Sequence, residues 1–128
     1  MEKIINDIEV KSIQFVNNKN DIVLSLTKYQ GGDIVYEKKL FFENILAVEI
    51  LFDMDQEMPL MPYLFIEINI KQVNLYETNK LPRFAQKRRN WGNYKNAFTV
   101  FCSGDVELNL ICKKVIETHD TVKQENLL

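Results

Sequence analysis

The side chain of this sequence best suited to proton transfer near neutral pH is its single histidine. This residue is His119, which stands beside Asp120 in a polar stretch at the end of the chain. A Ser-His-Asp or Cys-His arrangement would have to use it, because a nucleophile needs an adjacent base. A base must be held in place by its surroundings, and a polar chain end does not hold one. We therefore predict a solvated tail histidine and a protein that is not an enzyme.

Three alternating carboxylates have a spacing that could begin a calcium site. Asp53, Asp55 and Glu57 follow one another at every second position, as in the first part of a calcium-binding loop. Such a loop needs glycine at its sixth position, which is Met58 here, and glutamate at its twelfth, which is Leu64. We expect a solvated turn, with an anionic recognition patch as the alternative.

The two cysteines are too few for a structural zinc site. Cys102 and Cys112 are ten residues apart, whereas zinc sites use four ligands at tight spacing. We expect both to be reduced and to pack as small buried hydrophobic residues. The chain also lacks the GxGxxG and GxxxxGK[ST] patterns of nucleotide-binding loops. The sequence therefore predicts no metal, no cofactor and no catalytic residue.

The most distinctive stretch is a window without acidic residues between Glu77 and Asp105. It holds six of the sixteen Lys and Arg residues of a chain whose eighteen Asp and Glu residues give it a net charge of −2. Aromatic residues lie between these cations, and Trp, Tyr and Arg contribute most at protein interfaces. The predicted partner-binding residues are Arg83, Lys87, Arg88, Arg89, Trp91, Tyr94 and Lys95.

Three interpretations of this basic window remain open. It can be a structural loop with solvated cations, a surface that binds a protein, or a site where bases of single-stranded nucleic acid stack on aromatic rings. The acidic balance of the chain disfavours nucleic acid, because nucleic-acid-binding domains are usually strongly basic. We therefore predict a protein partner. Single-stranded nucleic acid bound over residues 80–95 is the alternative, and a small apolar ligand inside a barrel is the third function.

Length and composition indicate one globular domain. A chain of 128 residues with 46% hydrophobic residues can bury a core without disulfides or metals. We expect this domain over residues 1–118 and a polar tail over 119–128. No run approaches the roughly 18 apolar residues of a membrane span, and the first residues do not form a secretory signal. We therefore expect a cytoplasmic protein that does not bind membranes, and exposed edge strands would allow a homodimer.

Alternation of hydrophobic and polar residues predicts antiparallel strands along most of the chain. The predicted strands cover residues 8–16, 21–29, 34–42, 64–71, 97–102 and 105–117. Gly, Asn and Asp clusters predict hairpin turns between several of them, and a phase change near Ser12 predicts a β-bulge. Residues 43–52 fit a strand better than a short buried helix, and residues 82–90 fit a short helix or a loop.

These elements predict an all-β domain, an antiparallel meander of about six to eight strands that forms a small barrel or a curved sheet with at most one short helix. Such closure protects the edges of the sheet. The predicted core consists of Ile22, Leu24, Leu26, Leu40, Val48, Ile50, Leu64, Ile66, Ile68, Ile70, Val100, Val106, Leu108 and Leu110.

Two segments carry a resemblance to a known class of proteins. In residues 40–45 a strand leads into a Phe-x-Asn-hydrophobic element, and in residues 101–108 a final hairpin precedes Cys112. This pattern resembles the small β-rich immunity-type proteins of bacterial toxin systems. The resemblance implies a bacterial protein that binds a cognate toxin and blocks it, without any chemistry of its own.

Overall fold

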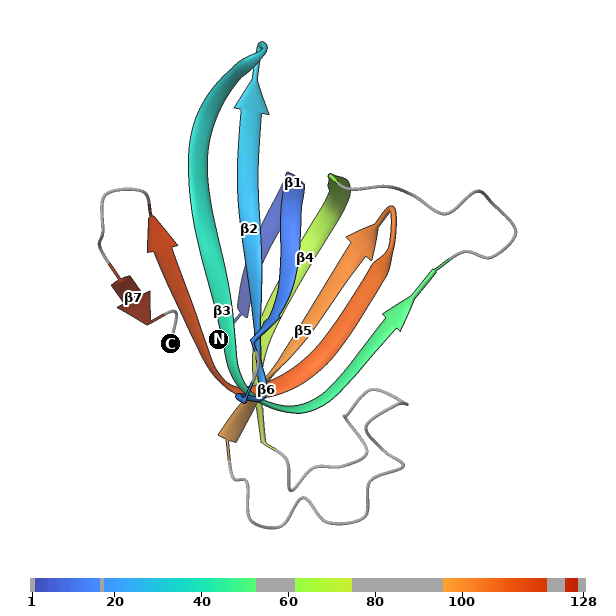
Figure 1. Cartoon of the computed structure of the whole chain (residues 1–128), viewed down its shortest axis with the longest axis vertical. Helices are drawn as coiled ribbons and strands as arrows, with labels where there is room; N and C mark the ends of the chain where they lie inside the picture. Colours follow the sequence, from blue (N-terminus) through green and yellow to red (C-terminus); the bar gives the residue numbers. More distant parts are fainter. Residues whose placement is uncertain (1, 17, 53–61, 75–95, 120–123, 127–128) are drawn as a thin grey trace.

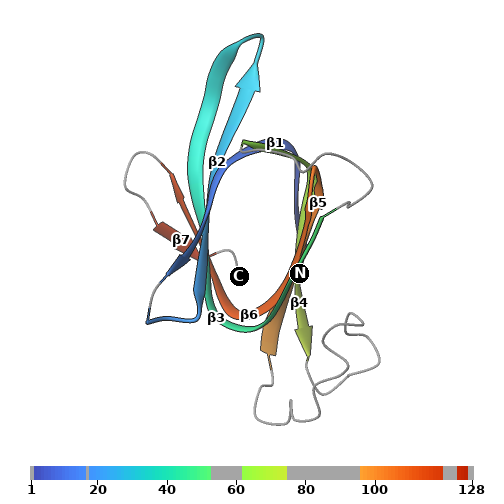
Figure 2. The ribbon, with the colours of Figure 1, turned by 45° about the vertical axis from the view of Figure 1, so that its right-hand side comes forward.

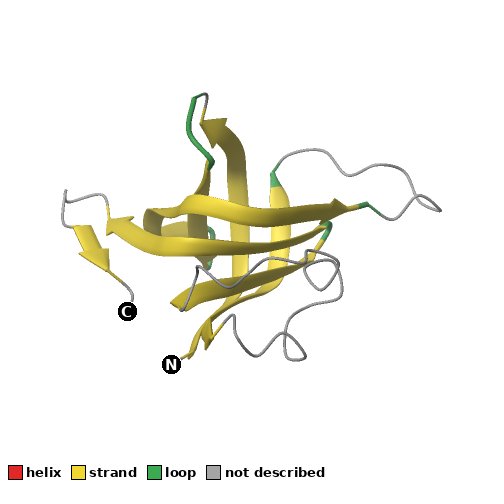
Figure 3. Cartoon of the chain, turned by 90° about the horizontal axis from the view of Figure 1, so that it is seen from below, coloured by secondary structure: helices red, strands yellow, loops and turns green. Residues whose placement is uncertain are grey.

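The computed structural model describes residues 2–16, 18–52, 62–74, 96–119 and 124–126. These residues form seven strands and, within the described ranges, no helix (Figure 3). The strands are β1 (Glu2–Val16), β2 (Asp21–Gln30), β3 (Asp33–Leu51), β4 (Tyr63–Asn74), β5 (Asn96–Gly104), β6 (Glu107–His119) and β7 (Gln124–Asn126). The prediction of an all-β antiparallel fold is confirmed.

Six of the strands close into a ring. The sheet order is β3-β2-β1-β4-β5-β6-β7 with antiparallel neighbours, and a further pairing of β3 with β6 joins the two sides of the sheet. Figure 1 shows the strands fanning out from one end, and the turned view of Figure 2 looks further into the ring. The prediction of a small barrel or a curved sheet is thus confirmed, in the form of a ring, and closure leaves most strand edges paired.

β3 is long because it takes part in both sides of this ring. The expectation of a strand over residues 43–52 is confirmed, and it continues the preceding predicted strand without a break. The strand bends at Asn44, whose φ is 56°. The backbone N–H of Asn44 donates to Asp21 Oδ1 at 3.0 Å, and that of Ile45 donates to the Asn20 carbonyl oxygen at 2.6 Å. These two bonds tie the bend to the turn that precedes β2.

The hydrophobic core fills the inside of the ring, with large side chains such as Phe42 and Phe65 fully buried. Most of the predicted core residues are buried. The confirmed ones are Ile22, Leu24, Leu26, Leu40, Ile68, Ile70, Val100, Val106, Leu108 and Leu110. The prediction is wrong for Val48, Leu64 and Ile66, which are exposed, and Ile50 is only half-buried.

The errors in β4 come from a kink that alternation cannot predict. Phe65 and Ile68 both face the core, so the two residues between them, Ile66 and Glu67, both face outward. The register of β4 against β5 shifts at this point, between Phe65 and Glu67. Because the side-chain period of a strand is two, one irregular residue moves the rest of a predicted face to the other side.

The predicted bulge and the glycine turn are both present. The register of β1 against β2 shifts between Val10 and Ser12, which confirms the bulge. Between β2 and β3, Gly31 and Gly32 have φ values of 60° and 86°, as a two-residue hairpin turn requires. No atom lies within 4 Å of a Cβ built on either glycine, so backbone conformation rather than space favours glycine there. The hairpin tip projects beyond the ring (Figure 1).

Candidate functional site

The predicted partner-binding residues Arg83, Lys87, Arg88, Arg89, Trp91, Tyr94 and Lys95 lie outside the described residues. The same holds for the acidic run from Asp53 to Glu57 and for the candidate helix over residues 82–90. These features stay predictions. The described part of the chain presents three other candidates, which are an exposed apolar face, a buried ion cluster and an apolar pocket.

The first candidate is an apolar patch on the outer surface of β1, β4 and β5. Ile4, Leu64, Ile66 and Phe101 are 49%, 50%, 62% and 38% exposed. Strand register places these residues on one face, with Asn69 of β4 between Ile4 of β1 and Phe101 of β5. The β4 kink adds Ile66. Single exposed apolar residues are ordinary, whereas a cluster on one face indicates an interaction surface.

Carboxylates lie among and beside these apolar residues. Besides Asp105, which is bound to the backbone of Leu64, the outward acidic residues within residues 2–9, 64–71 and 101–107 are Glu2, Asp7, Glu9, Glu67 and Glu107, and the outward cation is Lys71. Asn69 Nδ2 donates to Glu2 Oε2 at 3.1 Å and to Glu67 Oε1 at 3.4 Å. These bonds hold two of the carboxylates beside Ile4. We call the four apolar residues and these five acidic residues the acidic face.

The second candidate is an ion cluster centred on Glu117 of β6. The Glu117 carboxylate is 3% exposed and accepts from Lys38 Nζ at 2.9 Å and from Lys3 Nζ at 2.5 Å. His119 Nε2 lies 3.3 Å from Glu117 Oε1. Burial alone would raise the pKa of Glu117, but hydrogen bonds from Lys3 and Lys38, together with their charges, hold it below its ordinary value.

This cluster joins distant parts of the chain, and two ammonium groups already bind its carboxylate. Lys38 comes from β3, Lys3 from β1 and Glu117 from β6. Lys38 Nζ also lies 4.7 Å from the centre of the Tyr36 ring, and burial raises the pKa of Tyr36. A carboxylate bound by two ammonium groups is a poor proton acceptor. The geometry therefore indicates an ion cluster that stabilises the fold by joining β1, β3 and β6.

The structure corrects the placement of His119. We expected it in the polar tail over residues 119–128, but it is the last residue of β6 and pairs with Lys38 of β3. Further along, β7 pairs with residues 116–118 of β6. The expected burial of both cysteines is confirmed. Burial raises the pKa of Cys112 to about 12 and that of Cys102 further, so neither thiol ionises near neutral pH.

The described residues contain no group of three or more His, Cys, Asp or Glu side chains arranged to hold a metal ion. They also contain no helix whose length and hydropathy would let it cross a membrane.

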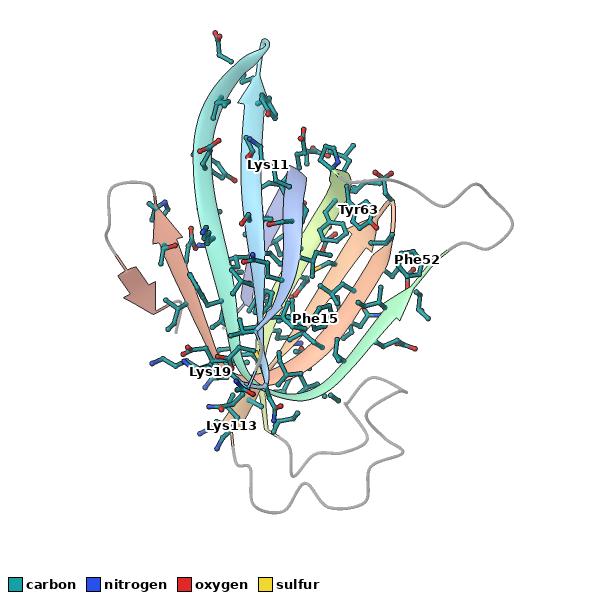
Figure 4. All side chains as sticks on the ribbon, in the orientation of Figure 1. Lys11, Phe15, Lys19, Phe52, Tyr63 and Lys113 are labelled. Carbon is teal, nitrogen blue, oxygen red and sulfur yellow. The ribbon has the colours of Figure 1, made fainter. Side chains whose placement is uncertain are left out.

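The third candidate is an open apolar pocket of about 340 Å³. Its lining combines the apolar residues Phe15, Ile22, Ile45 and 46–48 with Lys19, Asn20 and Asp21. Val48 pairs with the buried Leu110 but lines this opening, which explains why it is exposed. Figure 4 labels Phe15 and Lys19 among the side chains at this end of β1 and β2. The volume of this pocket lies at the lower end of the range that is typical of small-ligand pockets.

Sequence reasoning missed the acidic face because its members are scattered. Glu2 and Ile4 come from β1, Glu67 from β4 and Phe101 from β5, so only strand order and register bring them together. Ile66 was assigned to the core. The predicted first strand began at residue 8 and so did not include Glu2 and Ile4, which lie two residues apart on one face of β1.

Comparisons with known proteins support the fold alone. No protein-family model matches the chain, and no curated protein matches it. The fold is similar to that in the crystal structure of an uncharacterized protein from Neisseria gonorrhoeae, with a TM-score of 0.57 and 17% sequence identity. The similarity covers 91% of this chain and 96% of that one. The two proteins therefore share an architecture over nearly their whole lengths.

Proposed function

We propose that this protein is a non-enzymatic protein-interaction module of the immunity type, which binds a toxin partner and blocks it. The observation that carries the proposal is the acidic face, where four exposed apolar side chains share one surface with five carboxylates. Exposed apolar side chains that gather with charged ones on one face indicate an interaction surface. The resemblance to immunity-type proteins supports a toxin as the partner.

The charge of the face specifies the chemistry of the partner. Carboxylates around the patch favour a surface on which Lys and Arg surround an apolar centre. Two acidic faces repel each other, which disfavours a second copy of this chain as the occupant. Phosphates are anions, so the face also disfavours nucleic acid. The partner that fits is therefore a protein with a basic surface, and binding alone would block that surface.

The two alternative functions rest on other parts of the chain. Single-stranded nucleic acid would use the basic window over residues 80–95, which lies outside the described residues. A small apolar ligand would use the pocket beside Phe15, because large side chains fill the inside of the ring. Neither alternative uses the acidic face.

The test is affinity capture from a lysate of the cells that produce the protein, followed by mass spectrometry. The immobilised proteins are the wild type, Ile66→Lys and Phe15→Lys. Ile66 is the most exposed apolar residue of the acidic face, and Phe15 is an apolar residue of similar exposure that lies outside it, so the second substitution is a matched control. We expect a basic protein to be captured by the wild type and by Phe15→Lys but lost with Ile66→Lys.

Two further measurements make the result decisive. The captured protein should be inactivated when purified wild type is added to it, and Ile66→Lys should fail to inactivate it. Capture that survives Ile66→Lys but is lost with the double variant Arg88→Glu, Arg89→Glu would move the binding site to the basic window. The absence of any specifically captured protein would contradict the proposed function.

A further inference from the structure

The β2–β3 hairpin extends beyond the strands that flank it. β1 pairs with β2 no further than Thr27, and β6 pairs with β3 no further than Lys38. Beyond those points the two strands pair only with each other among the described strands, up to the turn at Gly31 and Gly32. The hairpin is the projecting element at one end of the molecule in Figure 1. It therefore presents strand edges that the closed ring does not.

The edge of β3 over residues 33–37 contains neither Lys nor Pro. Proteins commonly protect such edges with Lys, with Pro or by covering them. This edge reads Asp-Ile-Val-Tyr-Glu, and Ile34 and Val35 are each 52% exposed. Val35 lies at a register irregularity, because Lys28 pairs with Tyr36 while Tyr29 pairs with Ile34. β-branched residues on an accessible edge favour the addition of another strand.

The charges of the edge specify what can pair with it. In an antiparallel pairing of two copies along all five residues, Asp33 of each copy would face Glu37 of the other. Facing like charges destabilise a strand pair, so a second copy is a poor occupant. A strand with a cation at each end and apolar residues between them would place opposite charges beside Asp33 and Glu37. Within the protein, Glu37 is already paired with Lys11, whose Nζ lies 3.4 Å from Glu37 Oε1 at the base of the hairpin, and both side chains are exposed (Figure 4 labels Lys11).

We propose that residues 33–37 of β3 accept an extended segment of a partner protein as an added antiparallel strand, with basic residues at both ends of that segment and apolar residues in its middle. This site is separate from the acidic face, since the hairpin edge and the outer surface of β1, β4 and β5 share no residue. Main-chain hydrogen bonds supply the affinity, and the two flanking cations supply the specificity.

The test uses a fluorescent peptide, Lys-Val-Ile-Val-Lys with a glycine spacer, and fluorescence anisotropy. The control peptide has the same side chains but carries N-methyl groups on alternate amides, which removes the donors that strand pairing needs. We expect saturable binding of the first peptide and none of the second. Backbone amide signals that shift in NMR spectra should be those of residues 33–37 and their immediate neighbours.

Two matched variants locate the site. Ile34→Lys adds a protecting cation to the edge and should weaken binding about tenfold or more. Leu51→Lys changes an apolar residue of similar exposure at the other end of β3, outside both proposed sites, and should leave peptide binding unchanged. Equal binding of the N-methylated peptide, equal binding by Ile34→Lys, or no binding at all would overturn the proposal. None of these outcomes bears on capture through the acidic face, so the two proposals fail independently.

Discussion

Glu117 is the residue whose burial and charge most affect the stability of this protein. Its carboxylate is 3% exposed and is bound by Lys3 and Lys38 from two other strands. Removing one partner of a buried ion pair leaves a charge without compensation, which costs about 3 kcal/mol or more. Lys38 would be that charge, since it is itself buried. We therefore expect Glu117→Gln to lower the free energy of unfolding by about 3 kcal/mol at neutral pH.

The same residue gives stability a defined pH dependence. Its pKa in the folded protein lies below the ordinary value of 4.5. A carboxyl group with a lowered pKa stabilises the fold above its unfolded pKa, and this contribution is lost as the pH falls through the folded pKa. Urea unfolding between pH 7 and pH 3 should therefore show a smaller acid-side decline in Glu117→Gln than in the wild type. The exposed Glu107→Gln is the control and should follow the wild-type curve; parallel curves for all three proteins would contradict this role of Glu117.

The burial of a single residue could be predicted from the sequence where the residue's own side chain and its immediate neighbours in the chain determine that burial. Cys102 and Cys112 are apolar thiols within alternating strands, and both are buried as expected. His119 was misplaced because its position depends on Lys38, which is far away in the chain and lies beside it only after β3 and β6 pair. The ion cluster was missed for the same reason, since its members are scattered from residue 3 to residue 119.

At the scale of elements, the alternation of hydrophobic and polar residues predicts where the strands lie. It predicts which side chains face the core only as far as the next bulge or kink in a strand. The strands, the Ser12 bulge and the Gly31-Gly32 turn carry local signals, and the structure has all of them. The β4 kink has no comparable local signal, because Leu64, Ile66, Ile68 and Ile70 alternate regularly in the sequence. The kink depends instead on the approach of β5, which the chain reaches some thirty residues later.

Gly104 is the residue of β5 that permits this approach. A Cβ at Gly104 would lie 2.1 Å from the Leu64 carbonyl oxygen and 2.8 Å from Phe65 Cα. Both are backbone atoms, so relief requires the strands to move apart. Asp105 secures the contact, because its backbone N–H donates to the Leu64 carbonyl oxygen at 3.0 Å and its Oδ2 accepts from Leu64 N–H at 2.9 Å.

We expect Gly104→Ala to lower the free energy of unfolding by about 2 kcal/mol, as overpacking typically does. The measurement is urea unfolding at neutral pH, with Ser103→Ala on the neighbouring exposed position as the control. Since the kink holds Ile66 outward, Gly104→Ala should also weaken partner capture. Wild-type stability of Gly104→Ala would show that the close approach is not required.

At the scale of the whole molecule, charge is distributed unevenly. The acidic face lies on β1, β4, β5 and the start of β6, whereas six of the sixteen Lys and Arg residues belong to the basic window. Charges at the rim of an interface act mainly on the rate of association and on its dependence on salt. The sign of the charges that accelerate binding therefore identifies the surface that meets the partner.

The most direct measurement is the association rate of the captured partner with three proteins at low and physiological salt: the wild type, Glu67→Lys, and the double variant Arg88→Glu, Arg89→Glu. If the acidic face meets the partner, the wild-type rate falls as salt rises and Glu67→Lys lowers it about tenfold at low salt, while the double variant binds as fast as the wild type or faster. A rate that is unchanged in Glu67→Lys and lowered in the double variant would contradict the assignment of the acidic face.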